Sequence, residues 1–369
     1  MGNQSGKMES MVSENIVTLY KDKRVFITGH TGFKGSWLAA VLQQLGATVH
    51  GYALAPATTP SHFNLLSGNY PTTIANILDK EQLNSAVQQA QPDIIFHLAA
   101  QALVRTSYTD PSNTYESNVI GTLNVLEAAK KCSSVKAVVL ITTDKVYENK
   151  EWEKPYSESD ELGGYDMYSS SKACCEILIR SYRNSFLNIA EYKKSHQILI
   201  ASARAGNVIG GGDWSADRLI PDIAISTSKN EKVQIRNPKS IRPWQHVLDC
   251  LYGYLLLGAR LLNEEKEFAT AWNFSPYSSE AKNVEAIAAI AKESWSNIDI
   301  SFGVPPENFH EAGLLILDNT KAIEQLGWKP VWNTTAAVHK TIAWYKAYYT
   351  GGNIMTGEHI TDFLKSITN

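Results

Sequence analysis

The residue types best suited to catalysis occur in two short segments near the middle of the chain. Thr143, Asp144 and Lys145 come directly after an apolar run, and Tyr168 and Lys172 follow further along. Together they provide a hydroxyl, a carboxyl, a phenol and two amines. A simple dehydrogenase needs only part of this set, so the additional acid and base predict a reaction that moves protons as well as a hydride.

Tyr168 and Lys172 are four positions apart, a spacing that places both side chains on one face of a helix. We expect the lysine ammonium to lower the pKa of the Tyr168 phenol, because a neighbouring positive charge favours the phenolate. Such a phenol can take a proton from a substrate hydroxyl. The spacing alone is also common on solvated helix faces, so the interpretation depends on the rest of the chain.

A glycine-rich segment near the start of the chain predicts a dinucleotide site. It lies between the strand-like run 24–28 and the helical pattern 36–45. Glycines there let backbone N–H groups approach a pyrophosphate at a helix N-terminus. The predicted cofactor contacts in this segment are Gly29, His30, Thr31, Gly32, Phe33, Lys34 and Gly35. The side chains of His30 and Lys34 have two possible interpretations: contact with phosphate or substrate, or a solvated position in the loop.

Strand-like and helical segments alternate through the first half of the chain. Apolar runs at 48–54, 94–98, 135–142 and 197–204 have the character of strands buried on both faces, and helical patterns occupy 80–91, 117–131 and the stretch ending at Asn184. This alternation predicts an α/β fold with a doubly wound parallel sheet. We expect a flexible leader (1–21), a dinucleotide-binding Rossmann domain (22–205) and a smaller C-terminal substrate lobe (206–369), with part of 244–275 returning to the first domain.

The composition of the 369 residues is that of a globular protein: 44% are hydrophobic, 19% are charged, and the net charge is -3. That charge provides no broad field for nucleic acid or an anionic membrane. The most apolar stretch, 251–262, is too short to span a bilayer. The four cysteines form no C-x-x-C pair, so we expect free thiols, no metal site and a cytoplasmic location.

Several further motifs give the chain a recognisable pattern. They are Phe96-His-Leu-Ala-Ala-Gln101, Asn118-Val-Ile-Gly-Thr122, Thr143-Asp-Lys-Val-Tyr147, Tyr168-Ser-Ser-Ser-Lys172, Arg204-Ala-Gly-Asn-Val208 and Arg242-Pro-Trp-Gln-His-Val247. With the glycine segment, the chain resembles an extended short-chain dehydrogenase/reductase over roughly 22–345. Within that superfamily it resembles the nucleotide-sugar 4,6-dehydratases. Members of that group share the sequence Thr-Asp-Glu, whereas Lys145 stands here in place of the glutamate. In this respect the chain resembles the branch that acts on CDP-glucose.

The resemblance implies NAD as cofactor and an internal redox cycle. Tyr168, assisted by Thr143 and Lys172, would deprotonate the sugar C4 hydroxyl while C4 loses hydride to NAD. Lys145 would then remove the C5 proton, and protonated Asp144 would assist departure of the C6 hydroxyl as water. Hydride return to C6 gives a 4-keto-6-deoxy sugar, which makes the protein a lyase. Further cofactor contacts implied are Asn76, Ile77, Leu98, Ala99, Ala100 and Asn118, together with Tyr168 and Lys172.

The resemblance also implies a nucleotide-diphosphate sugar, CDP-glucose, as substrate. It places Asn207 on the diphosphate and Arg242 near the phosphate or nucleotide, and Arg105, Arg218, Arg236 and His310 are further candidates. For Arg218 and Arg236 a solvated loop position is equally open. The family points to deoxysugar biosynthesis for surface polysaccharide such as lipopolysaccharide O-antigen.

Apolar stripes on the helical stretches 111–131 and 168–184 favour a homodimer, although packing within one subunit would explain them equally. Two other functions remain open. One is a nucleotide-sugar 4-epimerase or simple dehydrogenase, which would use Tyr168 and NAD without eliminating water. The other is a non-catalytic NAD-binding protein that has kept the fold.

We predict weak retention of NAD. The second strand ends at Tyr52-Ala53-Leu54, where a carboxylate normally binds the adenosine ribose, and no charged Asp, Glu, Lys or Arg occurs from Gly35 to Leu78. The same stretch offers no arginine for a 2′-phosphate, which favours NAD over NADP. Equilibrium dialysis of the purified protein should show NAD lost readily. Tight, stoichiometric NAD after dialysis would contradict this prediction.

Overall fold

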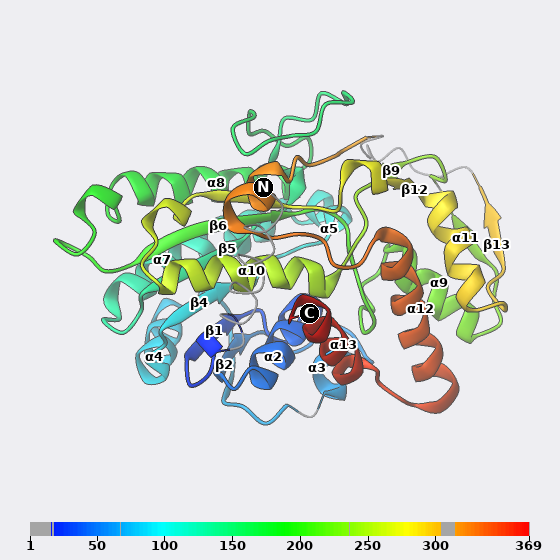
Figure 1. Cartoon of the computed structure of the whole chain (residues 1–369), viewed down its shortest axis with the longest axis horizontal. Coiled ribbons are helices and arrows are strands. Elements are labelled where there is room, and N and C mark those ends of the chain that lie inside the picture. The colour runs from blue at the N-terminus through cyan, green and yellow to red at the C-terminus, as the bar shows by residue number, and fades with distance from the viewer. Residues whose placement is uncertain (1–15, 17, 67, 236, 304–313, 369) are drawn as a thin grey trace.

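A seven-stranded parallel sheet forms the centre of the molecule in the computed structural model (Figure 1), which describes residues 16, 18–66, 68–235, 237–303 and 314–368. The spatial order of its strands is β3-β2-β1-β4-β5-β6-β11. Their bounds are β1 (Arg24–Thr28), β2 (Thr48–Ala53), β3 (Thr72–Ile74), β4 (Ile94–His97), β5 (Ala137–Ile141), β6 (Leu199–Ala205) and β11 (Ala271–Phe274). The predicted doubly wound parallel sheet is thus confirmed, and the strand order reverses between β1 and β4.

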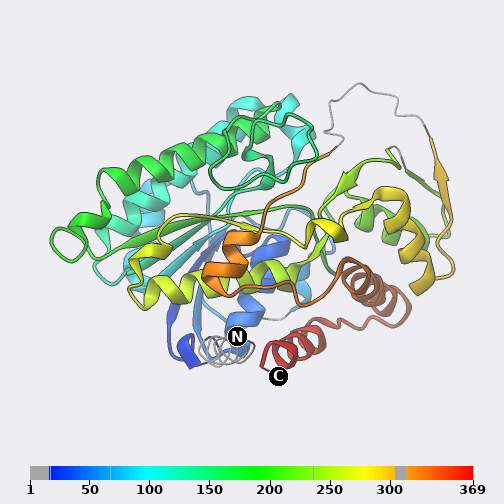
Figure 2. The same ribbon diagram turned by 45° about the horizontal axis from the view of Figure 1, so that its top comes forward.

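Helices cover both faces of this sheet (Figures 1 and 2) because successive strand residues point to opposite sides. Phe26 and Val138 lie in one core with α4 (Lys80–Ala90), α7 (Gly121–Lys131) and α8 (Met167–Asn184). Ile27 and Val139 lie in the other core, with α2 (Phe33–Gln44) and α10 (Val247–Leu262). The continuous apolar runs of the strands follow from this two-sided burial.

The helix expected over 117–131 begins earlier than the periodicity indicated. Pro111 opens α6 (Pro111–Tyr115), and the Asp110 side chain accepts a hydrogen bond from the Asn113 backbone N–H (3.1 Å), which fixes the start of the helix. A π-helical turn, Glu116–Ile120, then leads directly into α7. The wider turn shifts the side-chain pattern, so periodicity based on 3.6 residues per turn does not reveal the join.

After β6 the chain builds a second lobe and then returns to the sheet. Its elements are β7 (Val208–Ile209), α9 (Leu219–Ser228), β8 (Val233–Ile235), β9 (Ile241–Arg242), β10 (Gln245–His246), β12 (Lys282–Asn283), α11 (Val284–Ser294), β13 (Ile300–Phe302), α12 (Thr334–Gly351) and α13 (Thr356–Thr368). In between, α10 packs on β5 and β6, and β11 pairs with β6. Both α10 and β11 lie within 244–275, the stretch for which a return to the first domain was predicted. The division of the chain at residue 205 stays a prediction.

The expected flexible leader needs a correction at its C-terminal end. Residues 1–15 lie outside the described residues. Ile16 and Tyr20, by contrast, are buried in the core, and the Tyr20 phenol donates a hydrogen bond to the Leu255 backbone carbonyl (2.9 Å). A polar stretch thus ends in two anchoring side chains, which its average composition conceals.

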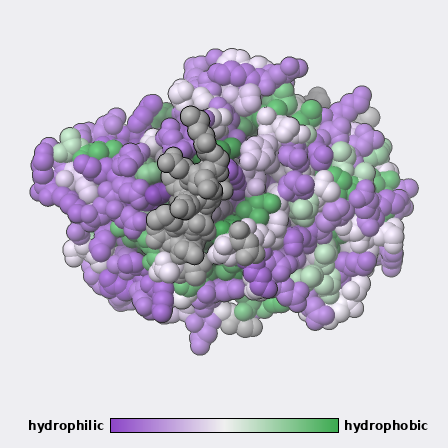
Figure 3. Space-filling view, viewed as in Figure 1, coloured by the Kyte–Doolittle hydropathy of each residue, from purple (hydrophilic) through white to green (hydrophobic). Residues whose placement is uncertain are grey.

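The face of the molecule shown in Figure 3 is mainly hydrophilic, with hydrophobic residues in small patches. In the part of the chain that the structure describes, no helix is long and apolar enough to cross a membrane. The apolar helix α10 is instead buried against the sheet.

Asp249, in the first turn of α10, predicts a pH-dependent stability. Its carboxylate accepts hydrogen bonds from the backbone N–H groups of Val331 (2.6 Å) and Trp332 (3.4 Å), yet burial raises the pKa of Asp249 to about 7. The unfolded chain has an aspartate pKa of about 3.9. Between these values only the folded state holds the proton, so this group's contribution to stability is present at low pH and is lost as pH rises to about 7.

Asp249→Asn should therefore be more stable than the wild type above pH 7, by on the order of a few kcal/mol, and the gap should close toward pH 4. Urea denaturation at several pH values measures this gap. Asp299→Asn, at an exposed position, is the matched control. A gap that does not change with pH would contradict the assignment.

Candidate active site

The glycine segment between β1 and α2 forms a tight cradle at the carboxyl ends of β1 and β4. A Cβ on Gly29 would lie 2.6 Å from the Ala99 backbone nitrogen, and one on Gly35 would lie 2.1 Å from the Gly29 carbonyl oxygen. Gly32 caps α2 without any side-chain hydrogen bond, and a Cβ there would have only the Gly29 carbonyl oxygen, at 3.4 Å, as a close neighbour. The N-terminus of α2 therefore fits a pyrophosphate.

The loop side chains brace this cradle rather than all facing a ligand. The Thr31 hydroxyl donates to the Leu54 carbonyl (2.8 Å), tying the loop to the end of β2. The His30 ring is fully buried and lies edge-on to Phe63 and Tyr70 at centroid distances of 5.2 and 5.9 Å. Burial lowers the pKa of His30 to about 4. The His30 ring therefore fits neither of the two predicted interpretations, a solvated side chain or a phosphate contact, although its backbone remains part of the cradle.

The rest of the predicted cofactor set lies around the same sheet edge. Asn118 is fully buried: its amide donates to the Gln101 carbonyl (3.0 Å) and the Ser171 hydroxyl (2.8 Å), so it joins the β4 loop to α8. Ile77 packs against Gly121, whereas Asn76 is exposed. Three further residues, Leu98, Ala99 and Ala100, are half-buried just after β4, and Phe33 and Lys34 are half-buried at the start of α2.

The expected acid lies immediately after β5. Thr143 caps the 3-10 turn Asp144–Val146, and its hydroxyl donates to Asp144 Oδ1 (2.9 Å) and accepts from the Lys145 backbone N–H (3.4 Å). Asp144 Oδ2 is buried and has no hydrogen-bond partner among the described residues. Burial raises the pKa of Asp144, although the charge of Lys145 and the Thr143 hydrogen bond lower it. These conditions favour a carboxyl group that carries a proton.

Lys145 lies beside Asp144 in the same turn and is half-buried. Its Nζ makes no hydrogen bond or ion pair with any residue that the structure describes. The amine is therefore free to act on a ligand in the cleft.

Tyr168 and Lys172 lie on the first turns of α8, and both are buried. The expectation that Lys172 lowers the pKa of Tyr168 is wrong for this structure. Burial raises the pKa of Tyr168 to about 12, against the hydrogen bond from Thr143, which lowers it. Lys172 Nζ donates to the Ile141 carbonyl (3.2 Å), and burial lowers the Lys172 pKa. An ammonium has three donors, so two remain available here for a ribose or a phenol.

The predicted substrate residues come from both parts of the chain: Arg105 lies on α5 (Val104–Thr109), which precedes β5, and the others follow β6 in the sequence. Arg218 donates to Asp213 Oδ2 (2.6 Å), and its charge acts on Tyr168. Arg105 pairs with Asp217 at 3.1 Å. Arg242, on β9, lies near enough for its charge to lower the Asp144 pKa. Three more positions complete the set. Asn207 follows β6, and its carbonyl accepts a hydrogen bond from the Gln245 N–H (3.0 Å). Arg236 and His310 lie outside the described residues.

A buried ion pair that the sequence interpretation missed lies directly behind the catalytic turn. Arg204 on β6 donates to Glu176 Oε2 on α8 (2.8 Å), and Glu176 also accepts from Thr142 (2.6 Å) and Ser202 (2.8 Å). The other end of the Arg204 guanidinium donates to the Tyr147 phenol (2.8 Å). Burial alone would raise the Glu176 pKa, but Arg204 and the hydroxyl donors hold it below its usual value. The sequence feature that could have revealed this pair is an arginine in a strand and a glutamate in a helix, each at a position where an apolar residue is expected.

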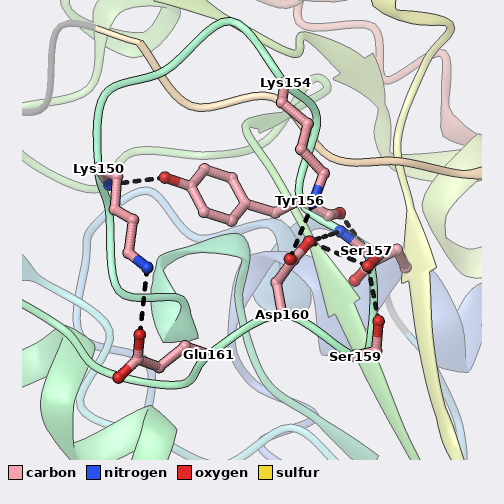
Figure 4. A network of polar contacts seen from close by, with 8 residues as sticks. Lys150, Lys154, Tyr156, Ser157, Ser159, Asp160 and Glu161 are labelled. Carbon is pink, nitrogen blue, oxygen red and sulfur yellow. Dashed lines mark hydrogen bonds and ion pairs between the residues drawn. The ribbon is translucent and has the colours of Figure 1, made fainter.

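The segment between the catalytic turn and α8 is closed by its own polar contacts (Figure 4). Lys150 pairs with Glu161 (3.2 Å), and the Tyr156 phenol accepts from the Lys150 N–H (2.6 Å). Asp160 accepts from the Ser157 N–H (2.7 Å). Tyr156 also forms a β-bridge to Leu317, which fastens the segment to the C-terminal part of the chain. The two catalytic elements are therefore joined by a braced connection.

This fold and cleft define a short-chain dehydrogenase/reductase of the nucleotide-sugar type. The family model described as GDP-mannose 4,6 dehydratase matches residues 26–341, and the chain belongs to that family. A CDP-glucose 4,6-dehydratase from Salmonella typhimurium is 46% identical over 97% of this chain and 100% of the relative. A dTDP-glucose 4,6-dehydratase from the same organism is 25% identical over 88% of this chain and 93% of the relative.

Solved structures agree with the fold. An epimerase from Methanothermobacter thermautotrophicus superposes with a TM-score of 0.78 at 22% identity, covering 95% of this chain and 98% of that one. A dTDP-glucose 4,6-dehydratase from Streptomyces venezuelae, solved with NAD bound, has a TM-score of 0.72 at 21% identity, covering 88% and 97%.

Arg204→Met should destabilise the protein by about 3–5 kcal/mol, because it leaves the Glu176 carboxylate buried without its counter-charge. Urea denaturation of the variant measures the loss. The double variant Arg204→Met/Glu176→Met should recover part of it, since both charges are then absent. Equal losses in the single and double variants would show that the pair is not coupled.

Proposed function

We propose that the protein is a CDP-glucose 4,6-dehydratase, a lyase that converts CDP-glucose to CDP-4-keto-6-deoxyglucose and water. The observation that carries the proposal is the buried turn Asp144–Val146, which places a protonatable carboxyl and a free amine beside Thr143 and Tyr168. An epimerase or a plain dehydrogenase has no use for that additional acid and base. The 46% identity to the Salmonella enzyme supports the cytosine nucleotide.

The cradle formed by Gly29, Gly32 and Gly35 fits NAD, with the pyrophosphate at the N-terminus of α2. Lys172 would hold the nicotinamide ribose with its free donors. Bound NAD supplies the acceptor for the hydride of sugar C4 and the donor of hydride to C6. The end of β2 provides no carboxylate for the adenosine ribose, because Ala53 and Leu54 occupy those positions.

Tyr168 takes the proton of the C4 hydroxyl in the first half of the reaction. Its pKa of about 12 means that the phenol is neutral before substrate binds. The Thr143 hydroxyl and the Arg218 charge both favour the phenolate. Loss of this proton, together with transfer of the C4 hydride to bound NAD, would produce a ketone at C4, which acidifies the neighbouring C5–H.

Lys145 and Asp144 perform the elimination. The free Lys145 amine removes the C5 proton, and the protonated Asp144 carboxyl donates its proton to the C6 hydroxyl, which leaves as water. Burial raises the pKa of Asp144, which favours the protonated carboxyl that this step requires. Asn207, Arg218 and Arg242 would hold the diphosphate, since guanidinium groups bind phosphate oxygens in a bidentate manner.

The test is incubation of the protein and NAD with CDP-, dTDP-, GDP- and UDP-glucose. A 4-keto-6-deoxy product shows a characteristic ultraviolet absorbance in alkali, and we expect it with CDP-glucose. An epimerase would change the sugar without producing that absorbance. Absence of turnover on every substrate would favour a non-catalytic NAD-binding protein.

Lys145→Met should retain C4 oxidation and lose most C5 proton exchange, by about 10²- to 10⁴-fold. Absorbance at the NADH maximum after adding substrate reports the first step, and deuterium incorporation from solvent into C5 reports the second. Thr143→Val is the comparison, because it should impair the first step. Near-normal deuterium entry in Lys145→Met would show that another group is the base.

We further propose a cytoplasmic homodimer that serves deoxysugar biosynthesis for surface polysaccharide. Ile120 and Ile177, on the neighbouring π-helical turn and α8, are 41% and 49% exposed, which favours burial against a second copy. Ile120→Asp with Ile177→Asp should yield monomers in sedimentation-velocity experiments. Ile74→Asp, at an exposed position of the edge strand β3, is the control and should leave the association state unchanged.

A further inference from the structure

A second pocket, of about 490 Å³, opens at the C-terminal end of α8, next to the loop that leads into β11. Arg180, Arg183 and Asn184 line it from α8, and Lys266, Glu267 and Thr270 line it from the loop. Arg183 is about 16 Å beyond Lys172 along the helix at 1.5 Å per residue. The pocket is therefore separate from the catalytic cleft, and no step of the reaction requires it.

Three cationic side chains around this pocket lack counter-ions. Arg180, Arg183 and Lys266 form no side-chain hydrogen bond or ion pair with any residue in the described ranges of the chain. Five other arginines, by contrast, are ion-paired: Arg24, Arg105, Arg204, Arg218 and Arg260. Glu267 is the one carboxylate lining the pocket within the described residues, and it forms no ion pair with these cations there.

Arg183 is the most unusual member of this cluster. Its Nη1 is buried and has no hydrogen-bond partner among the described residues. Burial and the charges of Arg204 and Arg180, against the attraction of Glu176, lower the pKa of Arg183 to about 10. A guanidinium nitrogen that is buried without a partner is costly, because neither water nor an acceptor compensates for its lost hydrogen bond. A bound anion would supply the missing partner.

We propose that this pocket binds a small phosphate ester. The two guanidinium groups and the Lys266 ammonium supply donors for the phosphate oxygens. Three cations and the Glu267 carboxylate leave a net charge that balances a phosphate dianion. Asn184 and Thr270 line the remaining space, and the volume falls within the range of small-molecule sites. An organic group attached to the phosphate fits that space.

Isothermal titration with glycerol 3-phosphate and with inorganic phosphate tests the proposal. The titrations are run with NAD and CDP present, so that phosphate-binding positions in the cleft are occupied. We expect one site per chain and tighter binding of the ester than of inorganic phosphate. Arg180→Gln and Arg183→Gln should each weaken binding about tenfold or more, the loss of a charge-assisted hydrogen bond. Lys266→Gln should weaken it less.

Lys80→Gln, at an exposed position on α4, is the matched control for Lys266→Gln and should bind as the wild type does. Thermal melting provides a second readout: without ligand, Arg183→Gln should raise Tm because it removes an unpaired charge, and the ester should raise Tm only where both arginines are present. No binding to the wild type at millimolar ester would overturn the proposal. Binding unchanged in both arginine variants would also overturn it, whatever reaction the cleft performs.

Discussion

The buried ion pair between Glu176 and Arg204 is the interaction on which the catalytic arrangement depends. Glu176 lies one helical turn beyond Lys172 on α8, and it binds Thr142 at the end of β5, directly before the catalytic turn. Arg204 joins it to Tyr147 on the far side of that turn. One pair of charges therefore fixes the helix that carries the phenol and both ends of the segment that carries the acid. Such a pair contributes little net stability, but breaking it is costly, so it enforces one arrangement.

A second series of buried hydrogen bonds holds the elements around the predicted cofactor site in place. The Thr122 hydroxyl donates its proton to the Asn118 carbonyl (2.6 Å), so it accepts a hydrogen bond from His97 Nε2 (3.0 Å). Because the neutral ring then carries its proton on Nε2, His97 Nδ1 accepts from the Thr28 hydroxyl (2.7 Å). Burial and the charge of Lys172 lower the His97 pKa to about 3, which keeps the ring neutral and this tautomer in place. These hydrogen bonds link β1, β4 and α7 beneath the glycine cradle, where the strand order reverses.

Much of this architecture was predictable because it follows from local patterns. The strand at 24–28 agrees with β1 at both ends, and the helix predicted to end at Asn184 does end there. The start of the helix predicted at 117–131 was less accurately placed, since a π-helical turn breaks the regular period. The anchoring of Tyr20 could not be foreseen, because its partner, Leu255, is far away in sequence.

The amino-acid sequence by itself determined the parallel alternating fold and the glycine cradle, and it singled out the five side chains predicted to react, since these are matters of local spacing and residue type. Tertiary structure decided their electrostatic states. Lys172 was expected to acidify Tyr168, but burial by segments distant in sequence outweighs that effect and raises the phenol pKa. Burial also raises the pKa of Asp144 and encloses the His30 ring. Desolvation depends on everything that packs around a group, and no local pattern records it.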